Sequence, residues 1–442
     1  MALSGLDIYK LLPKTNCKEC GFPTCLAFAM QLAKKAVSID KCPTVTPESK
    51  AALEQASQPP IRLVSIGTGD NKFDIGNETV LFRHEEKFRS PCGIGFIIDD
   101  SEKDEQIKAQ AGKINALRFE RVGQAIQVNC VAVRQTADAK RYAEAVAAVS
   151  ALTQLAVVLM PRDSAGLKAA LPAVQGRRPV IYGVTKDTLQ AYSAAAKEAG
   201  AAVVACAHDL DGLSALTQEL NKLGVADILL DTGKKKAAGK IWDLTQIRRL
   251  ALKKSNRPLG YPACVIVDDP DPCAQTLEAA AYILKYAGLV LMTNAANWQA
   301  YSLLTLRQNI YTDPQKPLQI EPKLYEIGKV SDTSPVLVTT NFSLSYFTVL
   351  GEVEGSKVPS YILSVDTEGQ SVLTAWASEK FTPDKISDTL KKLDVKAKAP
   401  KSDLVIPGYV AVMSGDLEDQ SGWKVIVGPK EASGIPSFLK NL

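Results

Sequence analysis

Histidine is nearly absent from this sequence. Only two imidazoles, His84 and His208, occur in 442 residues. A site that needs several of them, as metal ligands or as acid–base groups, is therefore excluded.

The sequence also lacks a strong charge excess and a long apolar run. The 52 Lys and Arg residues nearly balance the 48 Asp and Glu residues, and without a basic stripe we expect no nucleic-acid partner. No apolar run approaches the roughly 18 residues of a membrane helix. Asp7 and Lys10 interrupt the first residues, where a signal peptide would be apolar. We therefore expect a cytoplasmic protein with no membrane partner, and its length allows about three domains.

The nine cysteines are unevenly placed. Because their number is odd and we expect a reducing compartment, structural disulfides are disfavoured. Four of them follow the spacing C-x2-C-x4-C-x16-C, at Cys17, Cys20, Cys25 and Cys42. Four converging thiolates can hold a cubane iron–sulfur cluster, and they can also hold a tetrahedral structural zinc ion.

Two features of this segment favour the cluster over zinc. The paired C-x2-C motifs typical of zinc ribbons are missing. Apolar residues near the thiols would provide the dry pocket that tunes an electron carrier; they are Leu12, Phe22, Leu26, Phe28 and Ile39. After Cys42 the chain becomes rich in Pro, Ser and Gln, which predicts a linker and a first domain at residues 1–58.

Residues 59–311 alternate between short apolar runs and helical stretches. After a β-rich start there are eight strand-like runs, at residues 95–98, 125–133, 155–160, 179–184, 201–205, 226–230, 263–267 and 289–292. Continuously apolar strands separated by helices are typical of buried parallel strands with right-handed crossovers. Eight such units over about 220 residues favour a closed (β/α)8 barrel over an open sheet.

Polar residues follow several of these strands, where a barrel has its working face. We interpret most of them as N-caps of the following helices; they are Asp99, Asp100, Asn129, Arg162, Asp163, Asp209, Asp231, Asp268, Asp269 and Asn294. The other five cysteines are expected to be small buried or loop residues; they are Cys92, Cys130, Cys206, Cys264 and Cys273. The barrel therefore shows no enzyme signature of its own.

The last part of the chain predicts a second linker and a small domain. Residues 312–328 are rich in proline and charge, and residues 329–442 predict a compact α/β domain with strands at 335–340, 360–365, 404–406 and 424–427. The loops after these strands are rich in Gly, Ser and Thr. Open α/β sheets bind ligands at the carboxyl ends of their strands. Neither a G-x-G-x-x-G fingerprint after a strand nor G-x-x-x-x-G-K-[ST] is present, which disfavours nicotinamide and nucleoside triphosphate ligands.

The whole chain resembles the large (gamma) subunits of the corrinoid iron–sulfur proteins of the acetyl-CoA decarbonylase/synthase system. The most specific motif is N-C-K-E-C-G-F-P-T-C-L-A-F-A at residues 16–29, followed by K-C-P at 41–43. The resemblance implies an α/β protein with a small N-terminal [4Fe-4S] domain, a central (β/α)8 TIM barrel at residues 59–311 and a C-terminal Rossmann-like cobamide-binding domain. It also implies that Cys17, Cys20, Cys25 and Cys42 hold the cluster.

The function implied by the resemblance is that of a methyl carrier of the methyltransferase class. Cobalt(I) of the cobamide accepts a methyl group from methyltetrahydrofolate, through a methyltransferase, and passes it to the nickel centre of acetyl-CoA synthase. The [4Fe-4S] cluster reductively reactivates cobalt(II), with electrons from a low-potential donor such as ferredoxin. A small corrinoid iron–sulfur subunit completes the cobamide site in a heterodimer.

Cobamide contacts are predicted in three loops of the C-terminal domain. They are Thr340, Tyr346, Gln370, Ser371, Val372, Leu373, Thr374, Ser433 and Gly434, with Thr374 closest to the cobalt. Many B12 carriers place a histidine below the cobalt with a D-x-H-x-x-G motif, but residues 329–442 contain no histidine. Since an axial nitrogen stabilises cobalt(III), its omission favours return to cobalt(I).

Two other functions fit parts of the pattern. One is an iron–sulfur TIM-barrel oxidoreductase with a nucleotide- or flavin-binding tail, and the other is a zinc-headed scaffold protein without chemistry. The absorption spectrum of the purified protein separates the three, because corrinoid, flavin and zinc proteins differ in colour.

Overall fold

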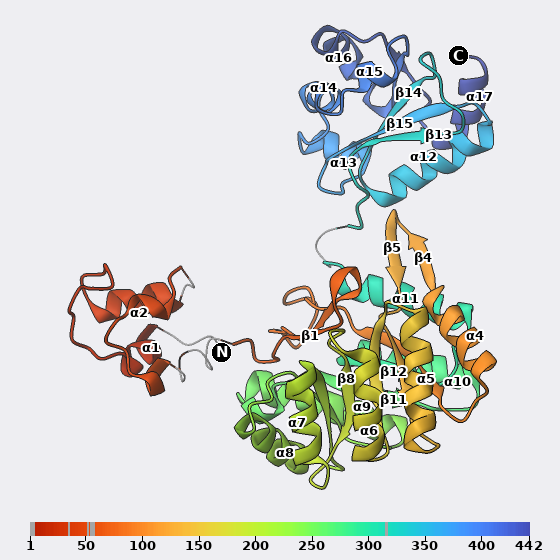
Figure 1. The fold of residues 1–442 in the computed structure, drawn as a ribbon. Helices are drawn as coiled ribbons and strands as arrows, with labels where there is room; N and C mark the ends of the chain where they lie inside the picture. Colours follow the sequence, from red (N-terminus) through yellow and green to blue (C-terminus); the bar gives the residue numbers. More distant parts are fainter. Residues whose placement is uncertain (1–4, 34–35, 51–52, 54–57, 314–316) are drawn as a thin grey trace. The chain divides into compact units, whose positions relative to one another are not determined.

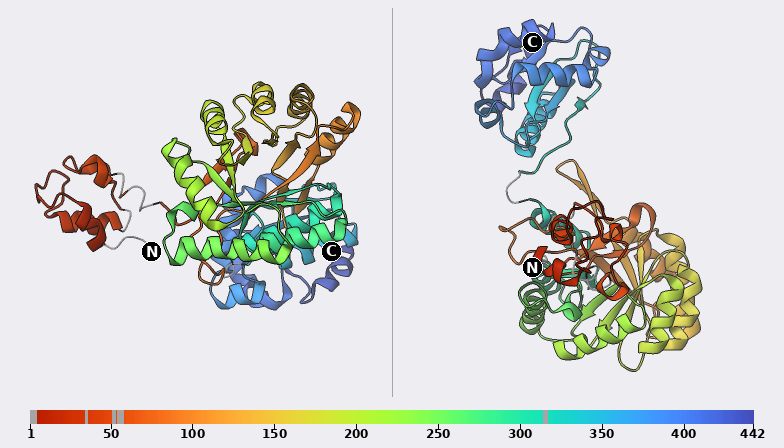
Figure 2. Two further views of the ribbon diagram at one scale, coloured as in Figure 1. Left: turned by 90° about the horizontal axis from the view of Figure 1, so that it is seen from below. Right: turned by 90° about the vertical axis from the view of Figure 1, so that its left-hand side faces the viewer.

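The computed structural model describes residues 5–33, 36–50, 53, 58–313 and 317–442 and is drawn in Figures 1 and 2. The chain forms two compact units, one of residues 1–118 and 127–311, the other of residues 119–126 and 312–442. The predicted α/β class is confirmed, with a closed eight-stranded barrel in the first unit and an open sheet in the second. Within the described ranges, no helix is long and apolar enough to cross a bilayer.

The thiol-rich N-terminal segment contains two short helices, α1 (Gly5–Leu11) and α2 (Cys25–Ala33), and a 3-10 helix (Ile39–Lys41). These elements share one small core, formed by Ile8, Leu12, Cys25, Phe28, Ala29, Ile39, Cys42 and Leu53. Helix α2 begins where the Thr24 hydroxyl accepts a hydrogen bond from the backbone N–H of Ala27 at 3.0 Å. A core of this size provides little apolar burial, which is the usual situation of small domains held together by a metal centre.

The barrel strands follow one another in the order β3-β6-β7-β8-β9-β10-β11-β12, and β12 pairs with β3 to close the ring. All these pairs are parallel. The strands are β3 (Gly93–Asp99), β6 (Cys130–Arg134), β7 (Ala156–Met160), β8 (Val180–Val184), β9 (Ala202–Cys206), β10 (Ile228–Asp231), β11 (Ala263–Val267) and β12 (Ala287–Met292). The predicted eight-stranded barrel is confirmed.

Helices cover the outside of the barrel strands (Figure 2). They are α4 (Asp104–Asn115), α5 (Ala139–Leu152), α6 (Ser164–Ala170), α7 (Leu189–Ala199), α8 (Leu210–Lys222), α9 (Ala237–Lys253), α10 (Pro272–Leu284) and α11 (Asn297–Tyr311). The N-cap interpretation is confirmed for Asp163 and Asp209, whose carboxylates accept hydrogen bonds from Gly166 N and Gly212 N. It is wrong for most of the others. Asp99 and Asp231 pair with the side chains of other residues, and Asp100 and Asn129 accept hydrogen bonds from other strand ends. The N-cap of α10 is Asp271, and neither Asp268 nor Asp269 takes that position.

The predicted strand at residues 125–133 is wrong in its first half. The structure has a hairpin there, β4 (Arg118–Arg121) and β5 (Gln124–Gln127), and the barrel strand β6 begins only at Cys130. The two turn residues, Val122 and Gly123, have φ angles of 56° and 66°, the left-handed pair that a two-residue hairpin turn requires. Because valine rarely adopts positive φ, no turn signal is visible in the sequence at this point.

A second hairpin, β1 (Val64–Ile66) with β2 (Phe73–Ile75), packs into the barrel interior. Gly93, the first residue of β3, leaves room for the Phe73 ring, since a Cβ on Gly93 would lie 2.7 Å from it. The amino ends of the strands are therefore filled by the hairpin.

The sheet of the second unit has the strand order β13-β15-β14-β16-β17, with bounds β13 (Leu324–Ile327), β14 (Val336–Thr340), β15 (Ser360–Val365), β16 (Leu404–Ile406) and β17 (Val425–Val427). All pairs are parallel except β13 with β15. The helices are α12 (Ser343–Ser356), α13 (Val372–Ala377), α14 (Pro383–Lys392), α15 (Val395–Lys398), α16 (Ser414–Ser421) and α17 (Ile435–Lys440). Two separate apolar cores show that both faces of the sheet are covered, one with α13, α14 and α16, the other with α12 and α17.

Strand β13 lies within the stretch that was predicted as a linker. Residues 324–327 pair antiparallel with β15 along their whole length, and Ile320 just before them is buried in the α12–α17 core. Proline and charge near residues 312–323 hide this strand in the sequence, because a four-residue edge strand carries little apolar signal of its own.

Candidate functional site

The carboxyl ends of β14, β15, β16 and β17 lie at one edge of the second unit's sheet. The chain passes from β14 to β15 on one side and later returns to β16 on the other side of β14. This reversal of direction is the topological switch point at which open α/β sheets bind ligands. The crevice is therefore expected between the loop after β14 and the loop after β16.

Three buried hydroxyls near these strand ends lack a hydrogen-bond partner among the described residues: Thr339, Thr340 and Ser364. Each side chain is 0–1% exposed. Thr339 and Ser364 are register partners across β14 and β15 and share the face of Leu337 and the α12–α17 core, whereas Thr340 belongs to the other face. A buried hydroxyl without a partner costs about 1–3 kcal/mol, so these groups are suited to a ligand that satisfies them.

Glycines bring the loops after β16 and β17 into backbone contact. A Cβ on Gly408 would lie 2.6 Å from the carbonyl oxygen of Gly428, and one on Gly434 would lie 2.9 Å from the Pro429 side chain. The Gly408 N–H donates to the Pro429 carbonyl at 3.1 Å. The predicted contact Gly434 thus helps to shape this loop pair, while the predicted Ser433 is exposed beside it.

The Gln370–Thr374 turn forms the rim after β15. The hydroxyls of Ser371 and Thr374 lie 3.0 Å apart, and the Ser378 hydroxyl donates to Gln370 Oε1 at 2.5 Å. Leu373 and Thr374 are exposed, and Val372 packs against the α13–α14 core. This part of the predicted set is brought together at one rim.

Tyr346 is separated from that rim by the sheet. It lies on α12, 5% exposed, with its ring centroid 4.7 Å from that of Tyr325 and 5.2 Å from that of Phe347. Burial raises its pKa well above the ordinary value of a tyrosine. The structure therefore divides the predicted contacts between two faces of the sheet, with Thr340 and the Gln370–Thr374 turn on one and Tyr346 on the other.

Sequence reasoning missed a set of exposed apolar side chains in the connections that follow the strand ends. They are Leu344 in α12, Trp376 in α13, and Tyr409 and Val412 after β16, and they accompany the predicted Leu373, which is also exposed. Val412 is 75% exposed and Leu344 66%. Exposed apolar side chains after strand ends are available to a ligand at that edge of the sheet. The sequence does place large apolar residues in loops and at helix starts, positions that are usually polar because they face solvent. That placement could have indicated these residues.

The N-terminal thiols gather only in part. Cys25 and Cys42 are buried in the small core and Cys20 packs against it, whereas Cys17 is exposed. Among the described residues, no group of three or more His, Cys, Asp or Glu side chains is close enough to hold a metal ion. Even so, the donor set is four thiols beside an apolar core, which is the chemistry that iron–sulfur clusters use.

Asn16 fixes one of these thiols. Its backbone N–H donates to Cys25 Sγ at 3.3 Å, and its side-chain oxygen accepts from the Cys25 N–H at 2.8 Å. Around it, Lys14, Lys18 and Gly21 have positive φ angles, as Asn16 itself does. Positive φ is uncommon for residues other than glycine, so the chain turns repeatedly around Cys17 and Cys20.

The mouth of the barrel contains a buried polar cluster. Lys240 Nζ donates to Asp231 Oδ1 at 2.6 Å, and Tyr182 OH donates to Asp231 Oδ2 at 2.5 Å. Burial raises the pKa of Tyr182, and the Asp231 carboxylate raises it further. These three groups satisfy one another's charge and hydrogen-bonding capacity. We therefore interpret the cluster as structural, filling the carboxyl ends of β8 and β10.

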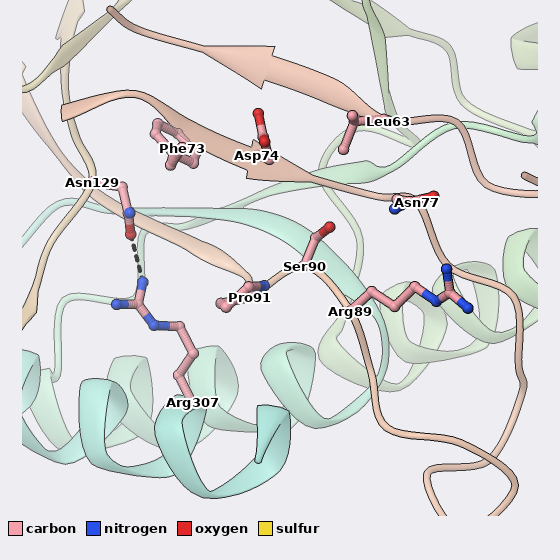
Figure 3. Close-up of a pocket in the computed structure, with 9 residues that line it drawn as sticks. All are labelled: Leu63, Phe73, Asp74, Asn77, Arg89, Ser90, Pro91, Asn129 and Arg307. Atoms are coloured by element: carbon pink, nitrogen blue, oxygen red, sulfur yellow. Dashed lines mark hydrogen bonds between the residues drawn. The ribbon is translucent and has the colours of Figure 1, made fainter. Parts of the chain in front are cut away.

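A cavity of about 390 Å³ lies near the amino ends of the strands and is lined by Leu63, Phe73, Asp74, Asn77, Arg89, Ser90, Pro91, Asn129 and Arg307 (Figure 3). Arg307 donates to the Asn129 side chain, to Cys92 O at 3.0 Å and to Gln127 O at 2.9 Å. These bonds tie α11 to the starts of β3 and β6. Arg307 therefore has a structural role at this end of the barrel.

A four-thiol head, a (β/α)8 barrel and a doubly wound domain define a multidomain α/β class of protein. The family model described as the CO dehydrogenase/acetyl-CoA synthase delta subunit matches residues 63–439, and a model for an Fe-S cluster matches residues 12–44. The chain is 46% identical over 441 residues to the "Corrinoid/iron-sulfur protein large subunit" of Moorella thermoacetica, covering 100% of this chain and 99% of the relative. It is 33% identical to the "Acetyl-CoA decarbonylase/synthase complex subunit gamma" of Methanothermobacter thermautotrophicus, with the same coverage.

The chain therefore belongs to the family of corrinoid/iron-sulfur protein large subunits and acetyl-CoA decarbonylase/synthase gamma subunits. The resemblance given by the cysteine motif is confirmed. Among solved structures, dihydropteroate synthase of Thermus thermophilus matches with a TM-score of 0.40 at 14% identity, covering 57% of this chain and 100% of that one, a likeness too distant to carry an argument.

Proposed function

We propose that this chain is the methyl-carrying large subunit of a corrinoid/iron–sulfur protein, with a cobamide in its C-terminal domain and a [4Fe-4S] cluster on its N-terminal cysteines. When bound, the cobamide would supply a cobalt(I) nucleophile for transfer of a methyl group from methyltetrahydrofolate, by way of a methyltransferase, to the nickel centre of acetyl-CoA synthase. The cluster, held by the four N-terminal cysteines, would supply one-electron reduction of cobalt(II). A small subunit, acetyl-CoA synthase and a ferredoxin-like donor are the partners.

The observation that carries the cobamide site is the set of buried hydroxyls without partners at the switch point, Thr339, Thr340 and Ser364. Exposed apolar groups lie in the connections that follow the same strand ends, including Leu373, Trp376, Tyr409 and Val412. A large ligand with an apolar periphery and amide groups suits both features, because apolar contacts supply affinity and a few polar contacts fix orientation.

The residues of this domain would hold the cobamide in distinct ways. Ser371 and Thr374 would present hydroxyls at the rim, with Thr374 closest to the cobalt, and Gln370 would fix the turn through Ser378. Val372 and Leu373 would contact the corrin edge. Thr340 would donate from the end of β14. Tyr346, Ser433 and Gly434 would contact parts of the ligand that extend toward α12 and α17.

No histidine from this domain can lie under the cobalt. Both histidines, His84 and His208, precede residue 312. Without an imidazole donor from the C-terminal domain, the protein does not stabilise the oxidised metal through that bond, which favours the low-valent form.

The N-terminal residues would hold the cluster through Cys17, Cys20, Cys25 and Cys42. Asn16 would orient Cys25 by its two hydrogen bonds. The apolar side chains of the small core, among them Phe28 and Ile39, would limit water at the cluster, which influences its reduction potential.

The decisive experiment is metal analysis and absorption spectroscopy on protein purified anaerobically with its small subunit. We expect about four iron atoms and one cobalt per large subunit, with corrinoid bands over an iron–sulfur shoulder. Flavin bands would instead favour the oxidoreductase, and a colourless zinc protein would favour the scaffold.

A matched pair of cysteine variants tests the cluster assignment. Cys20→Ala should lose cluster iron and the reactivation of cobalt(II) by low-potential donors, while pre-reduced protein still turns over. Cys273→Ala removes another accessible thiol, on α10 of the barrel, and should keep both properties. Normal reactivation by the Cys20→Ala protein would contradict the assignment.

A further inference from the structure

Asn341 is the central hydrogen-bonding residue of the loop after β15. It directly follows β14 and is 1% exposed. Its side-chain oxygen accepts from Thr367 N at 2.9 Å, Gly369 N at 3.0 Å and Thr367 Oγ1 at 3.1 Å. Its Nδ2 donates to Asp366 Oδ1 and to Gln319 Oε1, both at 3.2 Å. One amide group therefore joins two strand ends and a third segment.

That third segment is the connection into the second unit. Ser343 N donates to Leu318 O at 3.1 Å, and Ile320 N donates to Asn341 O at 3.0 Å. Gln319 forms an antiparallel bridge with Phe342. Residues 318–320 are thus attached to the loop after β14 on both sides of the Gln319 side chain.

Gln319 also packs directly on the loop after β15. A Cβ on Gly369 would lie 2.6 Å from Gln319 Cγ, so only a glycine leaves room for this side chain. Glu368 and Gly369 both have positive φ, 57° and 76°. A non-glycine residue in this region is strained, and the bonds from Asn341 hold the strained loop in place.

The loop in turn positions the rim of the proposed cobamide site. Gln370 N donates to Thr367 O at 3.2 Å, and Ala375 N to Ser371 O at 2.8 Å. The position of the start of α13, including Thr374, therefore depends on the position of residues 366–371. Gln319 therefore contacts the loop that leads to this rim in two ways, through its bond to Asn341 and through its packing on Gly369.

We propose that Gln319 and Asn341 form a brace through which residues 318–320 set the position of the Asp366–Ser371 loop and of Thr374 at the proposed cobamide site. This inference rests on the proposed function. Under it, residues 318–320 set the surroundings of the bound corrinoid as well as leading the chain into β13.

The test compares Gln319→Ala with Gln420→Ala in the full chain together with the small subunit. Gln420 is an exposed glutamine on α16 and has no part in the brace. In Gln319→Ala we expect amide hydrogen exchange in residues 366–371 to be about tenfold faster and the electron paramagnetic resonance signal of bound cob(II)alamin to change. Gln420→Ala should leave both unchanged.

Asn341 variants supply the second measurement. Asn341→Asp keeps the oxygen that accepts from Thr367 and Gly369 but loses the donors to Gln319 and to Asp366, and it places a second carboxylate beside that of Asp366. Its effect should therefore be at least as large as that of Gln319→Ala. Exchange rates and cob(II)alamin spectra equal to those of native protein in both variants would overturn the brace. If native protein binds no hydroxocobalamin, the proposed function fails instead, whereas unchanged exchange with normal cobalamin binding rejects the brace alone.

Discussion

At the scale of single residues, burial decides what a charged group contributes. Lys240 and Asp231 have side chains only 5% and 2% exposed and pair at 2.6 Å. Lys234 and Asp268, from the same region of the barrel, pair at 2.9 Å with 85% and 42% exposure. The two ion pairs have the same chemistry and nearly the same length, so they form a natural comparison of buried and exposed pairing.

Lys240→Met should destabilise the barrel by about 3–5 kcal/mol, because it leaves the buried Asp231 carboxylate without its cation. Lys234→Met should cost less than about 1 kcal/mol, since water already solvates that exposed pair. Denaturant unfolding of the two variants, followed by the far-UV signal, measures the difference. Equal effects would show that the Asp231 carboxylate finds another partner or is neutral in the native protein.

At the scale of elements, the close packing of the loop after β16 against the loop after β17 requires glycine at the points where their backbones touch. Gly408 has no room for a side chain next to Gly428 O and Lys430 N. Gly351, within α12, has nothing within 4 Å of its would-be Cβ and lies in regular helix. The same Gly→Ala change therefore has opposite consequences at these two positions.

Gly408→Ala should destabilise the second unit by about 1–3 kcal/mol, because the two loops must separate to admit the methyl group. Gly351→Ala should stabilise it by about 0.5–1 kcal/mol, through helix propensity. Thermal unfolding of both variants checks the signs. We further expect Gly408→Ala, and not Gly351→Ala, to weaken hydroxocobalamin binding, since the separated loops flank the proposed crevice.

Elements with strong periodic signals were predictable, and elements specified by tertiary contacts were not. The eight barrel strands and β14 to β17 could be predicted because each is a continuous apolar run between helices or turns. The β4–β5 hairpin was hidden by a valine at positive φ, and β13 by the prolines and charges around it. For the site, small residues at strand ends pointed to the edge of the sheet that carries the topological switch point. Asn341 and Gln319 could not be predicted, because their importance comes from contacts between segments distant in sequence.

At the scale of the whole molecule, two compact units carry separate cores. The barrel interior and the two cores of the second unit have no buried residue in common. A ligand that binds only one unit should therefore stabilise that unit alone.

Hydroxocobalamin at 100 times its dissociation constant should raise the free energy of unfolding of the second unit by about 2.7 kcal/mol. The first unit should unfold at an unchanged temperature. Differential scanning calorimetry with and without the cobalamin, together with hydrogen exchange to assign each transition, measures this. A uniform shift of both transitions would indicate that the units unfold as one cooperative body.

The edge strand β13 has a practical consequence for work on the isolated C-terminal domain. Since Leu324–Ile327 supplies the antiparallel neighbour of β15, a fragment that begins at residue 329 would leave the backbone N–H and C=O groups of that strand open to another chain. Exposed edges of this kind promote self-association. A fragment that starts before Leu318 would retain β13 as the neighbour of β15, and we expect this fragment to stay monomeric.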